Sequence, residues 1–213
     1  MLISKNQAMQ RLKKSKVVAI LRMASCDELM DTVAALIKGG LEFIEITMTM
    51  PDALNAIRNC SEQFRDQAIV GAGTVLDVDT ARQVVDAGAQ FVVSPIADIP
   101  TIEYCNRAGV IVMPGAMTPT EIHRAWKAGA DVVKIFSARA GGAAYFKDIK
   151  GPFPQIEILP TGGVDMKTAA GFLQAGACAV GIGAALVPAA LVREKRFGEI
   201  TDRAIELLNS VQQ

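Results

Sequence analysis

A short pattern recurs along the chain: a glycine that ends a helical stretch is followed at once by an apolar run. The five copies are Gly40 before LEFIEIT, Gly88 before AQFVVSP, Gly109 before VIVMPG, Gly129 before ADVVKIF and Gly176 before ACAVGIG. Glycine is favoured just past the end of a helix because it adopts positive φ without a steric cost. The spacings between these glycines are 48, 21, 20 and 47 residues, so a unit of about 20–24 residues fits once or twice in each gap. The chain is therefore predicted to repeat one strand followed by one helix.

The apolar runs predict eight strands that alternate with helices. The strands are expected at residues 17–21, 42–46, 68–72, 91–94, 110–113, 131–136, 156–160 and 178–182. Their nearly continuous apolar character is typical of parallel strands that are covered on both faces. Eight such units predict a TIM (β/α)8 barrel that forms a single domain over residues 1–213. An extra helix at about residues 4–14 precedes the first strand and is a candidate for closing the barrel floor.

Local motifs favour the barrel over its main alternative, an open doubly wound sheet. A doubly wound sheet would be expected to carry a GxGxxG dinucleotide-binding motif after its first strand, and this chain has no such motif there. Several helices have readable starts. The candidate capping boxes are Ser25-x-x-Glu28 and Thr118-x-x-Glu121, and Asp165 is a candidate N-cap.

The composition argues against several classes of protein. Because 22 basic residues balance 22 acidic ones, the chain lacks the basic footprint of a nucleic-acid-binding protein. No apolar stretch reaches the roughly 18 residues of a membrane span, and the N-terminus lacks the apolar core of a signal peptide. Four cysteines without CxxC spacing predict reduced thiols in a cytoplasmic protein. A single histidine argues against a catalytic zinc site, and we expect no metal or other cofactor.

One charged residue interrupts an apolar run: Lys134 lies in Asp131-Val132-Val133-Lys134-Ile135-Phe136. A buried ammonium group without a partner tends to lose its proton, and a neutral amine attacks carbonyl carbons. Glu45 interrupts the second strand in the same way. Because side chains alternate along a strand and TIM-barrel sites lie at the C-terminal strand ends, both groups are predicted to converge in the barrel mouth. A buried ion pair without a catalytic role is the alternative interpretation.

Other polar or glycine-rich segments follow the predicted strands. Thr161-Gly162-Gly163 and Gly181-Ile182-Gly183 follow the seventh and eighth strands, where this fold commonly binds phosphate; tight turns are the alternative. Arg22 ends the first strand, where its guanidinium would hold a carboxylate or form a salt bridge at the rim. Thr74 would bind a carboxylate or a water, or cap a helix, and the small residues of Gly71-Ala72-Gly73 before it are predicted to leave room for substrate.

Nine segments together resemble the 2-keto-3-deoxy-6-phosphogluconate aldolase family, which includes 4-hydroxy-2-oxoglutarate aldolases. They are VVAILR (17–22), GGLEFIEIT (39–47), IVGAGTVL (69–76), AGAQFVVSP (87–95), VMPGAMTPTE (112–121), AGADVVKIF (128–136), KGPFP (150–154), LPTGGV (159–164) and AVGIG (179–183). The segments lie in order and span nearly the whole chain. The resemblance implies a TIM barrel, a homotrimer and a class I aldolase that works without a metal.

The resemblance also implies roles for individual residues. Lys134 resembles the lysine that forms the Schiff base, and Glu45 resembles the general acid and base. The implied pocket residues are Arg22 and Thr74 at the keto-acid end, Pro95 and Phe136 as walls, and Gly162, Gly163 and Gly183 around a phosphate. Two positions depart from the family pattern: Thr49 stands where some relatives have an arginine, and Ser137 stands where many have a proline, with Arg139 close behind it.

The expected partner is a small, phosphorylated 2-keto acid, with no role for nucleic acid or membrane. The expected reaction cleaves 2-dehydro-3-deoxy-6-phosphogluconate to pyruvate and glyceraldehyde 3-phosphate. A further expected substrate, 4-hydroxy-2-oxoglutarate, would yield pyruvate and glyoxylate. Three alternatives stay open: a 2-dehydro-3-deoxy-6-phosphogalactonate aldolase, a sugar-phosphate isomerase or epimerase, and a non-enzymatic barrel that binds phosphorylated metabolites.

Overall fold

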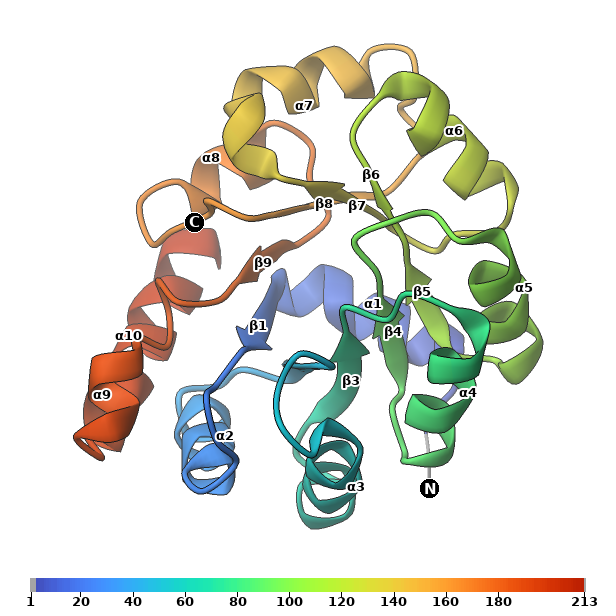
Figure 1. The fold of residues 1–213 in the computed structure, drawn as a ribbon. Helices are drawn as coiled ribbons and strands as arrows, with labels where there is room; N and C mark the ends of the chain where they lie inside the picture. The colour runs from blue at the N-terminus through green and yellow to red at the C-terminus, as the bar shows by residue number, and fades with distance from the viewer. Residues whose placement is uncertain (1–2, 213) are drawn as a thin grey trace.

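A ring of parallel strands surrounded by helices makes up the computed structural model of the protein, which describes residues 3–212 (Figure 1). The strands are β1 (Val17–Leu21), β2 (Phe43–Thr47), β3 (Ile69–Gly73), β4 (Phe91–Val93), β5 (Ile111–Met113), β6 (Gly115–Ala116), β7 (Val133–Phe136), β8 (Ile158–Thr161) and β9 (Val180–Ile182). The α-helices are α1 (Lys5–Ser15), α2 (Leu29–Lys38), α3 (Ala53–Gln63), α4 (Val78–Asp86), α5 (Ile99–Ala108), α6 (Pro119–Lys127), α7 (Gly142–Lys150), α8 (Ala169–Gln174), α9 (Ala189–Arg193) and α10 (Phe197–Gln212). A short 3-10 helix, η1 (Ala138–Ala140), follows β7.

The strands pair in chain order and close into a barrel. Six of them form one parallel sheet in the order β5-β4-β3-β2-β1-β9, and the other three form the sheet β6-β7-β8. β5 and β6 are two parts of one strand that Pro114 separates, so the chain leaves its partner β4 and continues beside β7. β8 and β9 lie side by side, and the N–H of Cys178 donates to the carbonyl of Ile158 at 3.0 Å. The predicted (β/α)8 barrel is confirmed, with the predicted strand 110–113 continuing as β6.

Several predicted strands begin one or two residues before the observed ones. For example, 131–136 was expected where β7 covers Val133–Phe136, and 178–182 where β9 covers Val180–Ile182. The residues before the observed strands include Val132 and Ala179, which are buried inside the barrel. An apolar run therefore records burial, which begins earlier than strand pairing.

The glycines of the recurring pattern end their helices as predicted. All five have positive φ, from 69° at Gly109 to 102° at Gly88. At Gly109, for example, the left-handed conformation lets its N–H donate to the carbonyls of α5. Each repeat thus turns sharply from its helix into the next strand.

One of the two predicted capping boxes is present. At the start of α6 the N–H of Thr118 donates to Glu121 Oε2 at 2.8 Å, and the N–H of Glu121 donates to Thr118 Oγ1 at 3.4 Å. The capping box predicted at Ser25 and Glu28 is wrong. The Ser25 hydroxyl instead pairs with Asp27 at 3.0 Å, and α2 begins without a side-chain cap. The nearer Asp27 competes for the serine because two-residue turns of this kind form locally.

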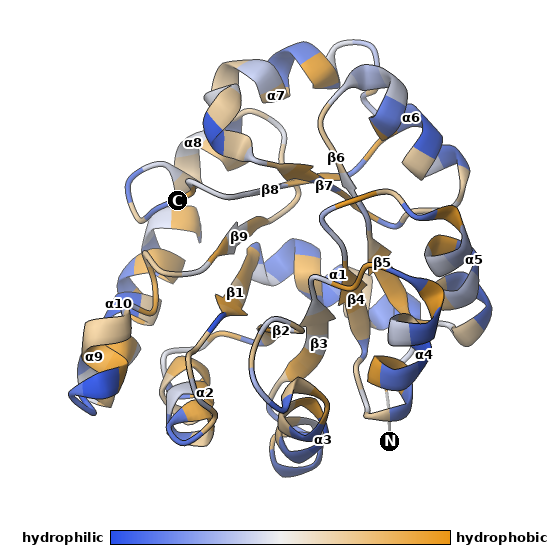
Figure 2. Ribbon diagram, in the orientation of Figure 1, coloured by the Kyte–Doolittle hydropathy of each residue, from blue (hydrophilic) through white to orange (hydrophobic). Residues whose placement is uncertain are grey.

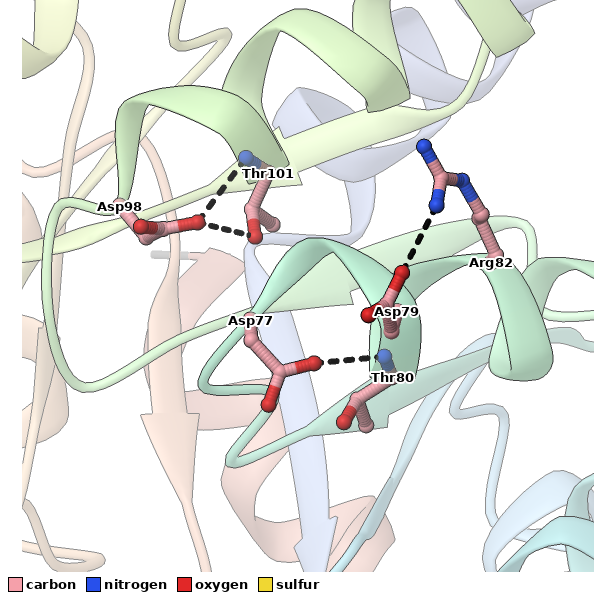
Figure 3. A network of polar contacts seen from close by, with 6 residues as sticks. All are labelled: Asp77, Asp79, Thr80, Arg82, Asp98 and Thr101. Carbon is pink, nitrogen blue, oxygen red and sulfur yellow. Dashed lines mark hydrogen bonds and ion pairs between the residues drawn. The ribbon is translucent and has the colours of Figure 1, made fainter.

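Aspartates cap several turns at the C-terminal ends of the strands (Figure 3). Asp77 accepts the N–H of Thr80 at 2.7 Å at the start of α4, and Asp98 accepts the N–H of Thr101 at 3.0 Å in α5. Asp165, predicted as a helix N-cap, accepts the N–H groups of residues 167 and 168, so it caps a turn ahead of α8. These bonds satisfy donors that would otherwise be free where each loop enters its helix.

Apolar side chains fill two layers, one inside the barrel and one between the strands and the outer helices. The strands are predominantly hydrophobic, and the helices turn hydrophilic residues outward (Figure 2). The inner layer gathers inward-facing residues such as Phe43, Phe91 and Leu159, together with Ala8 and Leu12 of α1. Within residues 3–212, no helix has the length and apolar character needed to cross a membrane.

The extra helix predicted at residues 4–14 is observed as α1 and covers one end of the barrel, behind the strands in Figure 1. Leu12 is fully buried against the inner layer. Three ion pairs join α1 to residues that precede β7, β2 and β8: Lys5–Asp131 at 2.8 Å, Arg11–Glu42 at 2.9 Å and Lys13–Glu157 at 2.5 Å. Because exposed pairs contribute little individually, burial of the apolar face is the main source of stability, and the pairs fix the direction of the helix.

Candidate active site

The inside of the barrel changes from apolar to polar along the strands. On β2, Phe43 lies in the apolar inner layer, and Glu45 follows two residues later on the same face. On β7 and β8 the same step leads from Val132 to Lys134 and from Leu159 to Thr161. The three polar side chains are buried, with exposed fractions of 2% for Glu45, 6% for Lys134 and 2% for Thr161. The repeat therefore brings together groups from strands that are far apart in the sequence.

Glycines in the neighbouring strands hold the space that these side chains need. A β-carbon at Gly73 would lie 1.8 Å from Oε1 of Glu45, and one at Gly181 would lie 2.5 Å from Cγ2 of Thr161. A β-carbon at Gly71 would meet the ring of Phe91 at 2.4 Å. The expectation that Gly71 and Gly73 leave room for substrate is therefore wrong. Their space is taken by Phe91 and by the carboxyl group of Glu45.

A cavity of about 810 Å³ opens at the C-terminal ends of the strands, and we call it the mouth cavity. Nine of the predicted site residues line it: Arg22, Glu45, Lys134, Phe136, Thr161, Gly162, Gly163, Gly181 and Gly183. The other two lie outside its lining. Thr74 lies behind Arg22, whose Nη2 donates to the Thr74 hydroxyl at 3.4 Å. The backbone of Pro95 packs against Gly115, where a β-carbon would meet it at 2.3 Å.

Lys134 and Glu45 share the mouth cavity without forming a contact ion pair. No N···O distance within 4.0 Å joins them. Burial lowers the pKa of Lys134, with a further contribution from the Arg22 charge, and the attraction of Glu45 opposes this shift. Burial also raises the pKa of Glu45, opposed by Lys134 and Arg22. Both shifts favour the uncharged forms, so the site contains an amine that is a better nucleophile and a carboxyl group better matched to proton transfer near neutral pH.

The glycine turn after β8 is braced by the segment after β7. The Ser137 hydroxyl donates to the carbonyl of Gly162 at 3.1 Å, and the N–H of Arg139 donates to the same oxygen at 2.9 Å. Gly162 and Gly163 both have positive φ, which a side chain at either position would disfavour. Ser137 thus supplies a hydroxyl that fixes this turn. The Thr161 hydroxyl at its base is buried without a hydrogen-bond partner in the described part of the chain.

Part of the mouth cavity was not expected from the sequence. Its lining extends to the loop after β1 and to α9; these additional residues include Met23, Ser25, Asp27, Glu28, Val187, Ala189, Val192 and Arg193. The rule that strand ends carry the site cannot identify residues of a helix such as α9. The neighbouring position of β9 and β1 in the closed ring was the one available signal, because it brings their loops together.

A buried amine of lowered pKa and a carboxyl group in the mouth of a barrel are the groups that an enzyme needs to form an imine with a carbonyl substrate. The comparison with protein families agrees. Residues 8–203 match the family described as KDPG and KHG aldolase, and the chain belongs to this family. The protein is an aldolase, a carbon–carbon lyase, which confirms the family and the activity class predicted from the sequence.

Individual relatives match over most of the chain. A 2-dehydro-3-deoxy-phosphogluconate aldolase from Treponema pallidum is 32% identical over 203 residues, which cover 95% of this chain and 96% of the relative. A 2-dehydro-3-deoxy-6-phosphogalactonate aldolase from Escherichia coli K12 is 34% identical and covers 84% and 87%. The crystal structure of KDPG aldolase from Legionella pneumophila, with pyruvate captured as a covalent carbinolamine, has a TM-score of 0.85 at 26% identity and covers 93% and 97%.

Proposed function

We propose that Lys134 forms an imine with the C2 ketone of 2-keto-3-deoxy-6-phosphogluconate, and that Glu45 carries protons during its cleavage. The observation that supports this most directly is the buried amine of Lys134, which faces the mouth cavity beside Glu45 without a contact ion pair. A close carboxylate would hold the amine as ammonium, whereas the observed separation leaves burial as the dominant influence on its pKa.

The reaction begins when the neutral amine of Lys134 attacks C2 of the keto acid. Glu45 donates a proton to the departing hydroxyl as the carbinolamine loses water, and an iminium ion forms. The Glu45 carboxylate left by this step then takes the C4 hydroxyl proton as the C3–C4 bond breaks, and the iminium accepts the electron pair. Glyceraldehyde 3-phosphate leaves, and an enamine of pyruvate stays on the lysine. Glu45 returns this proton to C3 of the enamine, and hydrolysis then releases pyruvate and frees Lys134.

The two ends of the substrate find different partners. Arg22 lines the mouth cavity while Thr49 does not, so Arg22 binds the keto-acid carboxylate in place of the arginine that some relatives carry at the Thr49 position. The phosphate at the opposite end of the substrate binds to the turn at Gly162 and Gly163 and to Gly183. The free Thr161 hydroxyl is a partner for a hydroxyl of the sugar chain.

The C4 epimer, 2-keto-3-deoxy-6-phosphogalactonate, is a second candidate substrate, supported by the 34% identity to the relative from Escherichia coli named for it. The two substrates differ in the configuration of the carbon that loses its hydroxyl proton. Measuring kcat/KM for both epimers and for 4-hydroxy-2-oxoglutarate ranks the candidates. A preference for the galactonate series by more than about tenfold would contradict the assignment to the gluconate series.

Borohydride trapping with pyruvate tests the mechanism. Reduction of the imine adds the pyruvate skeleton to one lysine, which peptide mass spectrometry identifies. We expect the adduct on Lys134, its loss in Lys134→Met, and its retention in Lys127→Met, which changes an exposed lysine of α6 outside the mouth cavity. An adduct on another lysine, or none on the wild-type protein, would overturn the proposal.

We also propose that three copies of the chain associate through the loops at the barrel mouth, in the cytoplasm. Three large apolar side chains follow β3 and β4 with high exposed fractions: Leu76 at 50%, Ile96 at 49% and Ile99 at 40%. Adjacent exposed apolar residues of this size are typical of an interface. The four cysteines are free thiols, as a reducing compartment would keep them. Sedimentation equilibrium measures the assembly, and Ile96→Asp is expected to lower its mass to that of one chain.

A further inference from the structure

The side chain of Arg139 packs against the glycine turn that follows β8. A β-carbon at Gly163 would lie 2.8 Å from Cβ of Arg139 and 3.0 Å from its Nε. The backbone of Arg139 is fixed there as well, because its N–H donates to the carbonyl of Gly162 at 2.9 Å. Arg139 also lines the mouth cavity. Its guanidinium is therefore held beside the turn, within the mouth cavity.

The charge of Arg139 has no acidic partner within 4.0 Å among residues 3–212. Arg82 and Arg196, by contrast, are held by acidic partners, Asp79 and Glu194. Asp165 lines the same cavity, but its carboxylate already accepts two backbone N–H groups of the turn before α8. An arginine that packs on a glycine turn without an acidic partner keeps its donors available to a ligand.

Other side chains near the glycine turn after β8 offer an anion few hydrogen-bond donors. The Ser137 hydroxyl already donates to the carbonyl of Gly162. Ala184, in the turn after β9, lines the cavity with a methyl group, which forms no hydrogen bond. Arg193 of α9 also lines the cavity, but Arg139 is the arginine that packs on the glycine turn, and its planar fork matches two oxygens of a phosphate.

We propose that Arg139 is a specificity-determining residue that selects substrates with a phosphate dianion at the end remote from the keto group. This inference rests on the proposed function, because the imine at Lys134 anchors the other end of the substrate. A dianion gains more from the guanidinium than a hydroxyl does, so Arg139 discriminates phosphorylated from unphosphorylated keto acids.

The test compares kcat/KM for 2-keto-3-deoxy-6-phosphogluconate with kcat/KM for its unphosphorylated counterpart. We expect Arg139→Ala to lower the first value about 10- to 100-fold, since a hydrogen bond to a charged group is lost. The second value changes by less than about twofold. Arg139→Lys keeps the positive charge but lacks the planar guanidinium, so its kcat/KM for the phosphorylated substrate is expected to lie between those of wild type and Arg139→Ala. Arg124→Ala removes an exposed arginine of α6 outside the mouth cavity and leaves both values unchanged.

Each outcome decides the role of Arg139. An equal loss for both substrates, or no loss for the phosphorylated one, overturns the proposal. Affinity for inorganic phosphate, measured by calorimetry, is expected to fall by a similar factor in Arg139→Ala, and an unchanged affinity would also overturn it. Pyruvate trapping on Lys134 separates the two proposals, because pyruvate carries no phosphate. If the wild-type protein traps pyruvate but Arg139→Ala keeps its substrate preference, only the specificity assignment fails.

Discussion

Replacing Gly73 by alanine tests whether the position of the Glu45 carboxyl group matters for the reaction. The new β-carbon would lie 1.8 Å from Oε1 of Glu45 and 2.5 Å from its Cδ. Since non-bonded carbon and oxygen atoms need about 3 Å or more, the carboxyl group must move by more than about 1 Å. Gly73 lacks positive φ, so alanine brings no backbone strain of its own.

The displacement predicts a loss that a kinetic assay resolves. Misplacing a reacting group by about 1 Å costs on the order of 100-fold in rate, which lies within the contribution of about 100- to 10,000-fold typical of general acid–base catalysis. We therefore expect kcat for pyruvate release to fall about 100-fold in Gly73→Ala. Overpacking is expected to lower the free energy of unfolding by about 1–3 kcal/mol.

Gly171→Ala is the matched control, because a β-carbon at Gly171 in α8 meets nothing within 4 Å. Alanine is preferred to glycine inside a helix by about 0.5–1 kcal/mol, so this variant keeps its kcat and unfolds at a higher temperature. Thermal unfolding establishes that both variants are folded under the assay conditions. If folded Gly73→Ala retains kcat within about threefold of wild type, Glu45 is not the proton carrier and the reasoning is refuted.

Three further predictions concern stability. Lys134→Met combined with Glu45→Gln removes two buried ionisable groups, so urea unfolding should show a gain of about 1–4 kcal/mol together with loss of activity; a loss of stability would contradict the cost assigned to burial. Because the folded protein raises the pKa of Glu45, it binds that proton more tightly than the unfolded chain does, and its stability falls as pH rises from the ordinary value of 4.5 through the raised one. In the single variant Glu45→Gln, the free energy of unfolding measured between about pH 4 and 8 should no longer show this fall. An unchanged dependence on pH would exclude Glu45 as its source. Leu12→Ala opens the buried contact between α1 and the barrel and should cost about 2–5 kcal/mol, while kcat at a temperature where the variant is folded stays near wild type.

The repeated unit made most of the fold predictable. Apolar runs and glycines at helix ends are local sequence patterns that predict strands and helices. The eight units and the extra helix α1 could therefore be predicted without any knowledge of contacts. Lys134 and Glu45 were predictable for a related reason, because a charge inside an apolar strand contradicts its surroundings and needs an explanation. Strand alternation alone predicts which residues of a strand share a face.

Features that depend on packing between units were not predictable. A glycine such as Gly73 looks the same whether its space is taken by substrate or by a neighbouring side chain, and only the barrel shows that Glu45 occupies it. The N-cap expected at Ser25 failed because Asp27 competes for the same hydroxyl. Residues of α9 enter the cavity because ring closure brings β9 beside β1, a contact between the two ends of the repeat.

The helix α1 also constrains the order in which this molecule can be completed during synthesis. It leaves the ribosome before two of its ion-pair partners, Asp131 and Glu157, which lie in the second half of the sequence. The inward-facing residues that bury Leu12 include Leu159, which is also made late. Until then the apolar face of α1 has no complete surface on which to dock, and contacts of such long sequence separation form slowly. The helix α1 is thus made before the surface that secures it, and its apolar face stays uncovered while residues 131–159 are being added.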